Sequence, residues 1–305
     1  MLRKVIRPLL ALPFVVWGYS VVHAQVSCIL LGASSGTANQ NASPNGQLTL
    51  INPATGTFTH ICTLGFGLGA MAQHPITGVL YAVDAPGFSA TLQPRRLIRL
   101  EPFNCSETTI GTNLGVGRFG IADLAFRNDG TLFAWSENSD DLITINTTTG
   151  VGTIVANAGI STFGSGLEFG PDGVTLYLAG NGGNGALRTV NTTTGITTVV
   201  VPAMTGSPAP GFPISALSFG NGQMYGAHKT RFPSSTLPSA DNLVTINLTT
   251  GVITNMGPSV PKLDALAWYC STAAPTFGTW QTLILTIVLV SAAYWQLRRR
   301  KHIIV

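Results

Sequence analysis

A nine-residue pattern recurs five times along the chain and constrains its fold more than any other feature. Each copy starts with Leu, continues with alternating apolar and polar residues, and ends in a turn. The copies are Leu48–Gly56, Leu97–Cys105, Leu142–Gly150, Leu187–Gly195 and Leu243–Gly251, and the diverged second copy carries Cys105 where the others have Gly. Alternation followed by Gly at a position of positive φ predicts the first strand and the turn of a short hairpin.

A second motif precedes most of these hairpins. Its copies are Ala70–Tyr81, Ile121–Ala134, Gly166–Leu178 and Ala216–Tyr225. Three of them place Asp-Gly or Asn-Gly between two apolar strands, which predicts another tight hairpin. Two hairpins in each unit give four short strands.

The spacing of the units identifies the architecture. The Leu positions 48, 97, 142, 187 and 243 are separated by 49, 45, 45 and 56 residues. This period, with four strands in each unit, is typical of propeller blades and not of helical solenoids. The longer last interval contains a Pro- and Ser-rich insertion around Thr230–Ala240, which we expect to be an extended loop.

The two ends of the repeat region indicate how a ring would close. Asp264–Trp268 matches a first strand with no blade after it, and Cys28–Gly32 opens a unit that lacks its first strand. We therefore predict an all-β, five-bladed β-propeller over residues 25–271, in which the C-terminal strand completes the N-terminal blade. An open β-sandwich and a β-solenoid are the alternatives.

Four cysteines lie in this region, and their spacing matches no metal-binding motif. An exported chain meets an oxidising compartment, where two disulfides form, and the sequence allows three pairings. The expected register places Cys28 and Cys270 on neighbouring strands of the closing blade. Cys62 then pairs with Cys105.

The N-terminal residues 1–24 read as a secretory signal peptide. Arg3, Lys4 and Arg7 precede a largely apolar run, Pro8–Val22, and small residues precede a cleavage point before Gln25. This pattern predicts processing by signal peptidase. An uncleaved membrane anchor is the alternative.

An apolar segment near the C-terminus, residues 280–297, contains no charged residue and is followed by Arg298, Arg299, Arg300 and Lys301. Its length is close to what a transmembrane helix needs, and basic residues remain on the cytoplasmic side. We predict a helix across the inner membrane, a cytoplasmic tail at residues 298–305, and the repeat domain outside the cytoplasm. A buried core helix is the alternative.

Residues 272–279 form a linker that leads into this segment. Pro275, Thr276 and Trp280, the apolar segment and the basic cluster Arg298, Arg299 and Arg300 together resemble the IPTL-CTERM protein-sorting signal of Gram-negative bacteria. Ala274 and Phe277 replace its usual Ile and Leu. The resemblance implies recognition by an exosortase-like membrane peptidase and a destination on the cell surface or in the extracellular matrix. A degenerate signal that remains an anchor is the alternative.

The charge balance argues against nucleic acid as a partner. Seven of the 16 Lys and Arg residues lie in the two terminal segments, which leaves nine between Gln25 and Thr279 against all 12 acidic residues. The domain is therefore slightly acidic and lacks the positive footprint of a nucleic-acid-binding protein.

Three acidic residues, Asp123, Glu168 and Asp264, fall in or beside the innermost strand of three units. Oxygen ligands from different blades can hold Ca²⁺, as in metal-dependent propeller lactonases. Glu168 can equally serve as a hydrogen-bonding residue between blades. Ser34 formally fits a nucleophile elbow, but Asn- and Pro-rich sequence follows it in place of a helix. The histidines His60, His74 and His228 show no metal-ligand spacing.

These observations predict a non-enzymatic surface or matrix protein that presents one face of loops to a polysaccharide or protein ligand. We expect no catalytic residue, no metal and no cofactor. An exported hydrolase or metal-dependent enzyme with its site in the central channel is the main alternative. A structural role through self-association of the weakly charged surface is a third possibility.

Overall fold

The computed structural model describes residues 26–35, 46–85, 95–116, 120–136, 139–180, 185–207, 213–229 and 240–272. The chain divides into a compact unit, Cys28–Ser271, and a second unit of the two terminal segments, Met1–Ser27 and Thr272–Val305. The expected signal peptide, sorting motif and transmembrane segment lie outside the described residues. Within the described part, no helix is long and apolar enough to span a bilayer.

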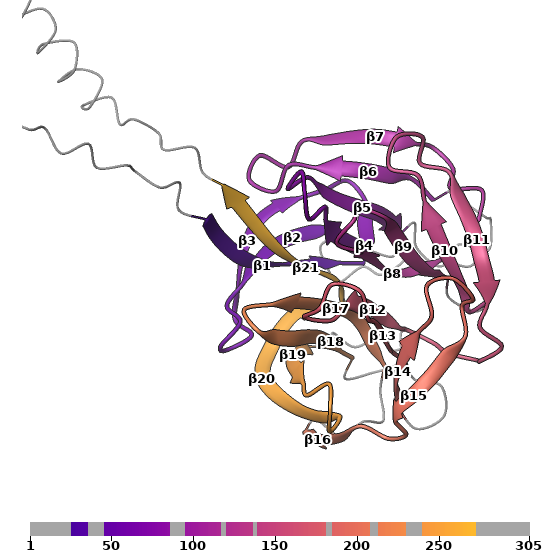
Figure 1. Cartoon of the computed structure of the whole chain (residues 1–305). Coiled ribbons are helices and arrows are strands. Elements are labelled where there is room, and N and C mark those ends of the chain that lie inside the picture. The colour runs from indigo at the N-terminus through magenta and orange to yellow at the C-terminus, as the bar shows by residue number, and fades with distance from the viewer. Residues whose placement is uncertain are drawn as a thin grey trace, which may run out of the picture. The chain divides into compact units, whose positions relative to one another are not determined.

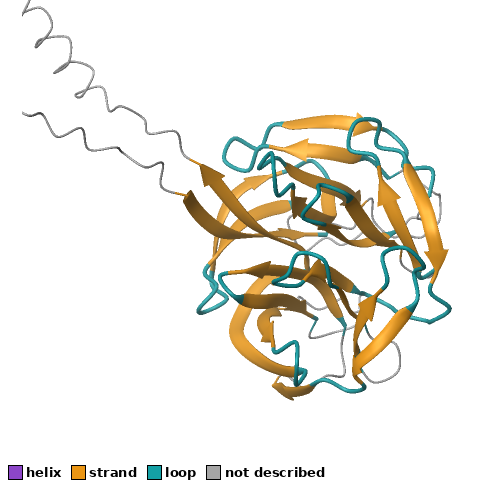
Figure 2. Cartoon of the chain, viewed as in Figure 1, coloured by secondary structure: helices purple, strands orange, loops and turns teal. Residues whose placement is uncertain are grey.

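The described part of the compact unit consists of strands and loops (Figure 2). The strands form five sheets around a common axis (Figure 1). From the axis outward, blade 1 contains β21 (Leu263–Thr272), β1 (Val26–Ser34), β2 (Gln47–Ile51) and β3 (Phe58–Thr63). Blade 2 contains β4 (Gly67–Gln73), β5 (Leu80–Ala85), β6 (Leu97–Leu100) and β7 (Glu107–Gly111). Blade 3 contains β8 (Ile121–Phe126), β9 (Leu132–Ser136), β10 (Asp141–Ile145) and β11 (Gly152–Asn157).

The remaining two blades follow the same plan. Blade 4 contains β12 (Gly166–Phe169), β13 (Leu176–Ala179), β14 (Leu187–Val190) and β15 (Thr197–Val201). Blade 5 contains β17 (Ile214–Gly220), β18 (Gln223–His228), β19 (Ala240–Ile246), β20 (Val252–Pro261) and β16 (Thr205–Ser207). This strand order confirms the five-bladed propeller and excludes the sandwich and the solenoid.

The hydrophobic core lies between the blades. Each of the five buried clusters in the described residues combines side chains from two neighbouring blades. Between blades 3 and 4, for example, Phe133 meets Phe169 edge to face with ring centroids 5.8 Å apart. The innermost strands are almost wholly buried, whereas the outermost strands are largely exposed. A blade therefore gains most of its buried area from its neighbours.

The repeated turn explains the repeated sequence. In blade 4, Asn191 Oδ1 accepts the backbone N–H groups of Thr193 and Thr194, both at 2.9 Å. Asn146 and Asn247 make the same bonds in blades 3 and 5. The turn then closes at a residue of positive φ, which favours Gly. Cys105 occupies this position in blade 2 with φ of 56°, as its place in the repeat predicts.

The C-terminal strand closes the ring. β21 is the innermost strand of blade 1 and lies beside β1, as predicted. A disulfide joins Cys28 to Cys270 on these two strands, with their Cα atoms 4.0 Å apart. A second disulfide joins Cys62 on β3 to Cys105 in blade 2, with a Cα separation of 6.4 Å. Both predicted pairings are confirmed.

Blade 5 departs from the expected four strands. β16 follows blade 4 along the chain and pairs in parallel with the outer edge of β20. The sequence analysis does not predict it, because Thr205–Ser207 is short and lacks an apolar alternation. β19 and β21 are also longer than the motifs that identify them.

The connections divide between two ends of the ring. In blades 2 to 5 the first-to-second connection, and in every blade the third-to-fourth connection, leaves at one end, which we call the hairpin end. The second-to-third connections and the crossings to the next blade leave at the opposite end, which we call the loop end. Because β21 is a first strand and β1 is a second strand, β21 finishes and β1 starts at the hairpin end.

We predict that removal of the ring-closing disulfide destabilises the protein more than removal of the second one. Their sequence separations are 242 and 43 residues, for which unfolded-chain entropy gives about 5.5 and about 4 kcal/mol. The free energy of unfolding of the full chain, measured with urea in detergent, should fall further in the Cys28→Ser, Cys270→Ser variant than in the Cys62→Ser, Cys105→Ser variant. A larger loss in the second variant would contradict this expectation.

Candidate functional site

The centre of the ring holds a buried carboxylate that binds three blades together. Asp123 on β8 is fully buried, and its Oδ1 accepts the backbone N–H of Leu124 at 2.9 Å. Its Oδ2 accepts the N–H groups of Leu167 on β12 and Leu217 on β17, both at 2.8 Å. The two oxygens of one side chain therefore connect blades 3, 4 and 5.

Local strand irregularities make these bonds possible. The pairing register shifts between Ile121 and Asp123 in β8, and between Ile214 and Leu217 in β17. Such bulges free backbone groups from the ladder and turn them in a new direction. The N–H of Leu217, directly after its bulge, is thus available to Asp123.

Glu168 continues this link between blades 4 and 5. Its Oε1 accepts the N–H of Phe169 at 2.7 Å, and its Oε2 lies 3.4 Å from the N–H of Phe219 on β17. Although part of the side chain is accessible, desolvation of its carboxyl raises the pKa of Glu168 to about 8 against these two bonds. Burial likewise raises the pKa of Asp123 well above its usual range, opposed by its three N–H donors, and the nearby Glu168 adds to that rise.

Asp264 belongs to a different group of charges, at the junction of blades 5 and 1. Lys229 Nζ lies 3.0 Å from Asp264 Oδ1, 3.2 Å from Asp241 Oδ2 and 2.6 Å from the carbonyl oxygen of Leu263. Desolvation lowers the pKa of Lys229, but the two carboxylates outweigh it and leave the pKa raised. This cluster connects β18 and β19 of blade 5 to β21.

The three acidic residues singled out in the sequence do not gather at one point. Asp123 and Glu168 lie close enough to interact and both bind backbone N–H groups, whereas Asp264 is paired with Lys229. Across the part of the chain that the structure describes, no group of three or more His, Cys, Asp or Glu side chains is arranged to hold a metal ion. Glu168 therefore serves as a hydrogen-bonding residue between blades, which was the alternative to a metal-binding role.

The other polar candidates also have structural partners. Ser34 is buried at the end of β1, and its Oγ accepts the N–H of Gln47 at 2.9 Å. His74 Nδ1 accepts the N–H of Ile76 at 3.1 Å in a hairpin turn. His60 bonds to Thr63 on the outermost strand of blade 1, and His228 is buried in blade 5. The structure does not bring the three histidines together.

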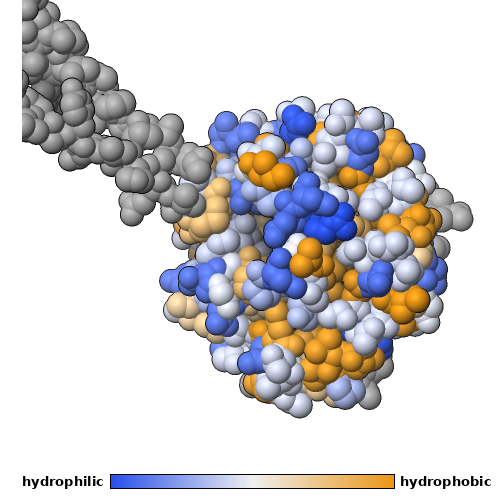
Figure 3. Space-filling model, in the orientation of Figure 1, coloured by the Kyte–Doolittle hydropathy of each residue, from blue (hydrophilic) through white to orange (hydrophobic). Residues whose placement is uncertain are grey.

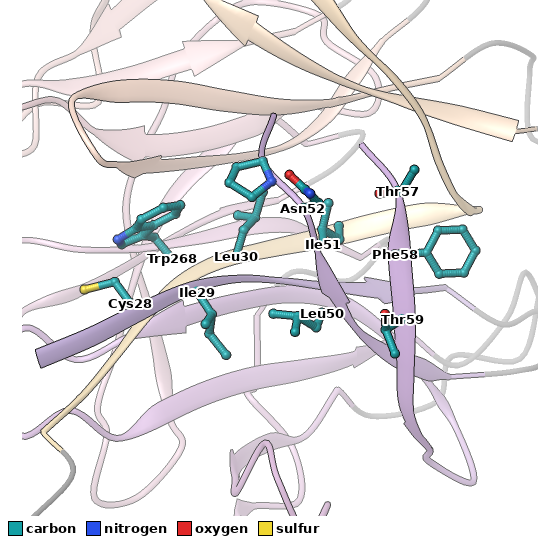
Figure 4. Close-up of a pocket in the computed structure, with 11 residues that line it drawn as sticks. Cys28, Ile29, Leu30, Leu50, Ile51, Asn52, Thr57, Phe58, Thr59 and Trp268 are labelled. Atoms are coloured by element: carbon teal, nitrogen blue, oxygen red, sulfur yellow. The ribbon is translucent and has the colours of Figure 1, made fainter. Parts of the chain in front are cut away.

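Blade 1 carries a shallow groove of about 500 Å³ (Figure 4). It crosses the blade from Trp268 on the inner strand to Phe58 on the outer strand. Its lining includes Cys28, Leu30, Ile51, Asn52, Phe58 and Trp268, and no lining residue carries a charge. Trp268 stacks on Tyr225 of blade 5 with ring centroids 5.7 Å apart, which fixes the inner end of the groove.

A neutral groove with aromatic side chains at both ends suits a neutral ligand and not an anion. Neither this groove nor the role of Lys229 was predicted from the sequence. Trp268 at the end of the closing strand was the available signal for the groove. For Lys229, the signal was a basic residue in a domain that has few charges.

No model of a known protein family matches the sequence, and no curated protein matches it. A chain in the crystal structure of a nidogen/laminin complex is 13% identical over 80% of this chain and 98% of its own length, with a TM-score of 0.49. TolB from Acinetobacter baumannii is 13% identical over 79% of this chain and 66% of its own length, with a TM-score of 0.42. At these scores the similarities support no functional argument, and the propeller assignment rests on the strand order.

We predict that Asp123→Asn lowers the free energy of unfolding by about 2–5 kcal/mol, because the new amide group turns an N–H toward buried backbone donors. Urea unfolding followed by Trp fluorescence measures this loss. Glu101→Gln, at an exposed turn, is the control and should change stability by less than about 0.5 kcal/mol. An Asp123→Asn protein as stable as the wild type would argue against a structural role for this carboxylate.

We also predict that stability falls as the pH rises from about 5 to 8. The folded protein holds the Glu168 proton up to about pH 8, whereas the unfolded chain releases it near 4.5, so the folded state binds more protons in this interval. The expected slope is on the order of 1 kcal/mol per pH unit, reduced by the partial exposure of Glu168.

Glu168→Gln should flatten this slope, since the amide does not titrate. Urea unfolding at a series of pH values measures this effect. Asp123 contributes in the same direction, so some slope should remain in Glu168→Gln. Identical slopes in the wild type and Glu168→Gln would show that Glu168 is not the titrating group.

Proposed function

We propose that this chain is an exported, non-enzymatic binding propeller of the cell surface or extracellular matrix, which uses its loop end to contact a polysaccharide or protein. Its two disulfides indicate an oxidising, extracytoplasmic environment. The proposal rests chiefly on one observation: the chain enters and leaves the propeller at the hairpin end, and its long connections belong to the other end.

The two ends differ in the kind of connection that they carry. At the hairpin end, the connections are short turns. Four of the third-to-fourth turns repeat one geometry, from an Asn to a Gly of positive φ: Asn52–Gly56, Asn146–Gly150, Asn191–Gly195 and Asn247–Gly251. At the loop end, the longest connections span residues 35–46, 86–96 and 229–239, between strands of blades 1, 2 and 5. Loops of unrelated sequence on a rigid scaffold are where binding specificity usually lies.

The point at which the C-terminal tail leaves the propeller suggests which end is tethered. The tail follows β21 and therefore continues from the hairpin end of the ring. If residues 280–297 span the inner membrane with Arg298, Arg299 and Arg300 inside, the tether is joined to the propeller at its hairpin end, and the loop end carries no chain terminus. Resemblance to the IPTL-CTERM signal supports later processing by an exosortase-like peptidase near Thr276.

The proposal of a non-enzymatic role is supported by the contacts of the three inner-strand carboxyl groups. Asp123 accepts backbone N–H groups of Leu167 and Leu217, and Glu168 accepts that of Phe219. Asp264 is paired with Lys229. Each of these contacts joins two different blades. The same residues are the ones on which an enzyme with its site in the channel would depend.

The proposed orientation predicts different accessibility of the two ends on intact cells. One epitope is inserted into the connection at residues 230–239, at the loop end, and the same epitope is inserted at Thr147 in the β10–β11 turn, at the hairpin end. In the full chain, antibody should reach the first epitope more readily than the second, because the tether lies at the hairpin end.

Two controls make this experiment decisive. Mass spectrometry of each protein should find an N-terminus at Gln25 and either an intact tail or an end near Thr276. An Arg298→Gln, Arg299→Gln, Arg300→Gln variant should lose correct insertion or processing. Labelling of either epitope only after permeabilisation would refute an extracytoplasmic propeller, and equal labelling of both before processing would refute the proposed orientation.

A further inference from the structure

The outermost strand of blade 4 is an open sheet edge without charge. β15 has the sequence Thr-Thr-Val-Val-Val, and among the strands of the described residues it pairs with β14 alone. In an antiparallel ladder, hydrogen-bonded pairs of residues alternate with pairs that are not bonded to each other. Asn191 N donates to the carbonyl of Ile196 at 2.9 Å, so these two residues form a bonded pair. The N–H and C=O groups of Thr197 and Val199 therefore point away from β14, toward the open edge. Such an edge pairs with another strand unless something blocks it.

The outer strands of the other blades each have a feature that opposes pairing. In blade 5, β16 already covers the edge of β20. In blade 3, the first residue of β11 is bonded outward, since Gly152 N donates to Leu114 O of the preceding connection at 2.8 Å. β7 begins with Glu107, and β3 contains His60 in its centre. Among the described residues, β15 has none of these features. It shares with β3, β7 and β11 an irregular pairing register, which on β15 falls at Val200 and leaves Thr197 to Val199 as the regular part of the edge.

An apolar surface surrounds this edge. Ile196, Val199 and Val200 have 63%, 45% and 40% of their surface exposed. Ile154 of blade 3 and Val252 of blade 5 are also exposed, and both of these blades contact blade 4 close to β15 or its turn, through Ala156 and Gly251. Figure 3 shows apolar surface in the lower right part of the view, where Figure 1 places β14 and β15.

We propose that β15 is a self-association edge, which pairs antiparallel with β15 of a second copy of this chain. Two identical antiparallel strands are related by a two-fold axis, so one surface serves as both partners and the assembly closes as a dimer. A second copy also offers what this edge requires, namely an uncharged Val-rich strand with unpaired backbone groups. β16 on β20 is an example, within this molecule, of an added strand on an outer edge.

Charge repulsion does not oppose this pairing. The nearest basic side chain on the sheet is Arg188, which lies on β14 directly opposite Val199. Across the paired edges, the two Arg188 residues would be three strand spacings apart, about 14 Å, which is beyond the Debye length in physiological salt. The described exposed residues on and beside this edge, Ile154, Ile196, Thr198, Val199, Val200 and Val252, are Thr, Val and Ile.

Sedimentation velocity of the purified full chain in detergent tests this proposal, from low micromolar to submillimolar protein. The wild type should show a monomer–dimer equilibrium. Val199→Lys should raise the dissociation constant at least about tenfold, because it places a charge on the edge of each copy at the two-fold contact. Val200→Glu should have the same effect. Thr108→Lys, exposed on the edge strand β7, is the matched control and should dimerise like the wild type.

Circular dichroism of each variant establishes that it is folded before its association is compared. A wild type that stays monomeric over the whole range overturns the proposal. So does a folded Val199→Lys protein that dimerises as strongly as the wild type, since the contact then lies elsewhere. Open-ended oligomers that Val199→Lys abolishes would overturn the two-fold arrangement.

Discussion

The structure depends on closure of the ring, because no blade can bury both of its faces alone. Each hydrophobic cluster is shared by two neighbouring blades, and the cluster between blades 5 and 1 exists only because β21 returns to the first blade. Trp268, Leu266 and Leu263 on that strand all pack toward blade 5. A chain that ended before β21 would expose one face on each side of the gap and leave β1 as an open edge.

Polar contacts make the same closure specific. Gln73 on β4 donates its side-chain amide to Cys270 O and accepts the N–H of Cys270, both at 2.8 Å, so one side chain behaves like a piece of neighbouring strand. On the other flank of β21, Ser218 Oγ accepts the N–H of Trp268 at 2.7 Å. Asp123 likewise accepts backbone N–H groups from strands of blades 3, 4 and 5. Hydrophobic packing alone tolerates sliding between blades, whereas these bonds set one relative position.

The repeat was sufficient to predict the blades, because the turn between the third and fourth strands requires particular residue types at fixed positions. Asn146 and Gly150 recur at fixed spacing since the turn needs an acceptor and then a positive φ, and the same logic identified Cys105 and its partner. The polar centre was less predictable. Sequence placed Asp123, Glu168 and Asp264 on inner strands, but Lys229 and the bulge before Leu217 depend on contacts between distant residues that leave no local pattern. β16 was missed for a related reason: in the described part of the chain it pairs with β20, an edge that exists only after blade 5 has formed.

The position of the Cys28–Cys270 bridge has a mechanical consequence. Any pull on the chain beyond Thr272 enters the propeller through β21 and reaches Cys270 only two residues inside that strand. From there the load passes covalently into β1, so such a pull cannot peel β21 away from the ring one hydrogen bond at a time. A protein held by its C-terminus against flow or against the movement of a bound partner would transmit force through the blade as a unit, with a covalent bond at the point of greatest load.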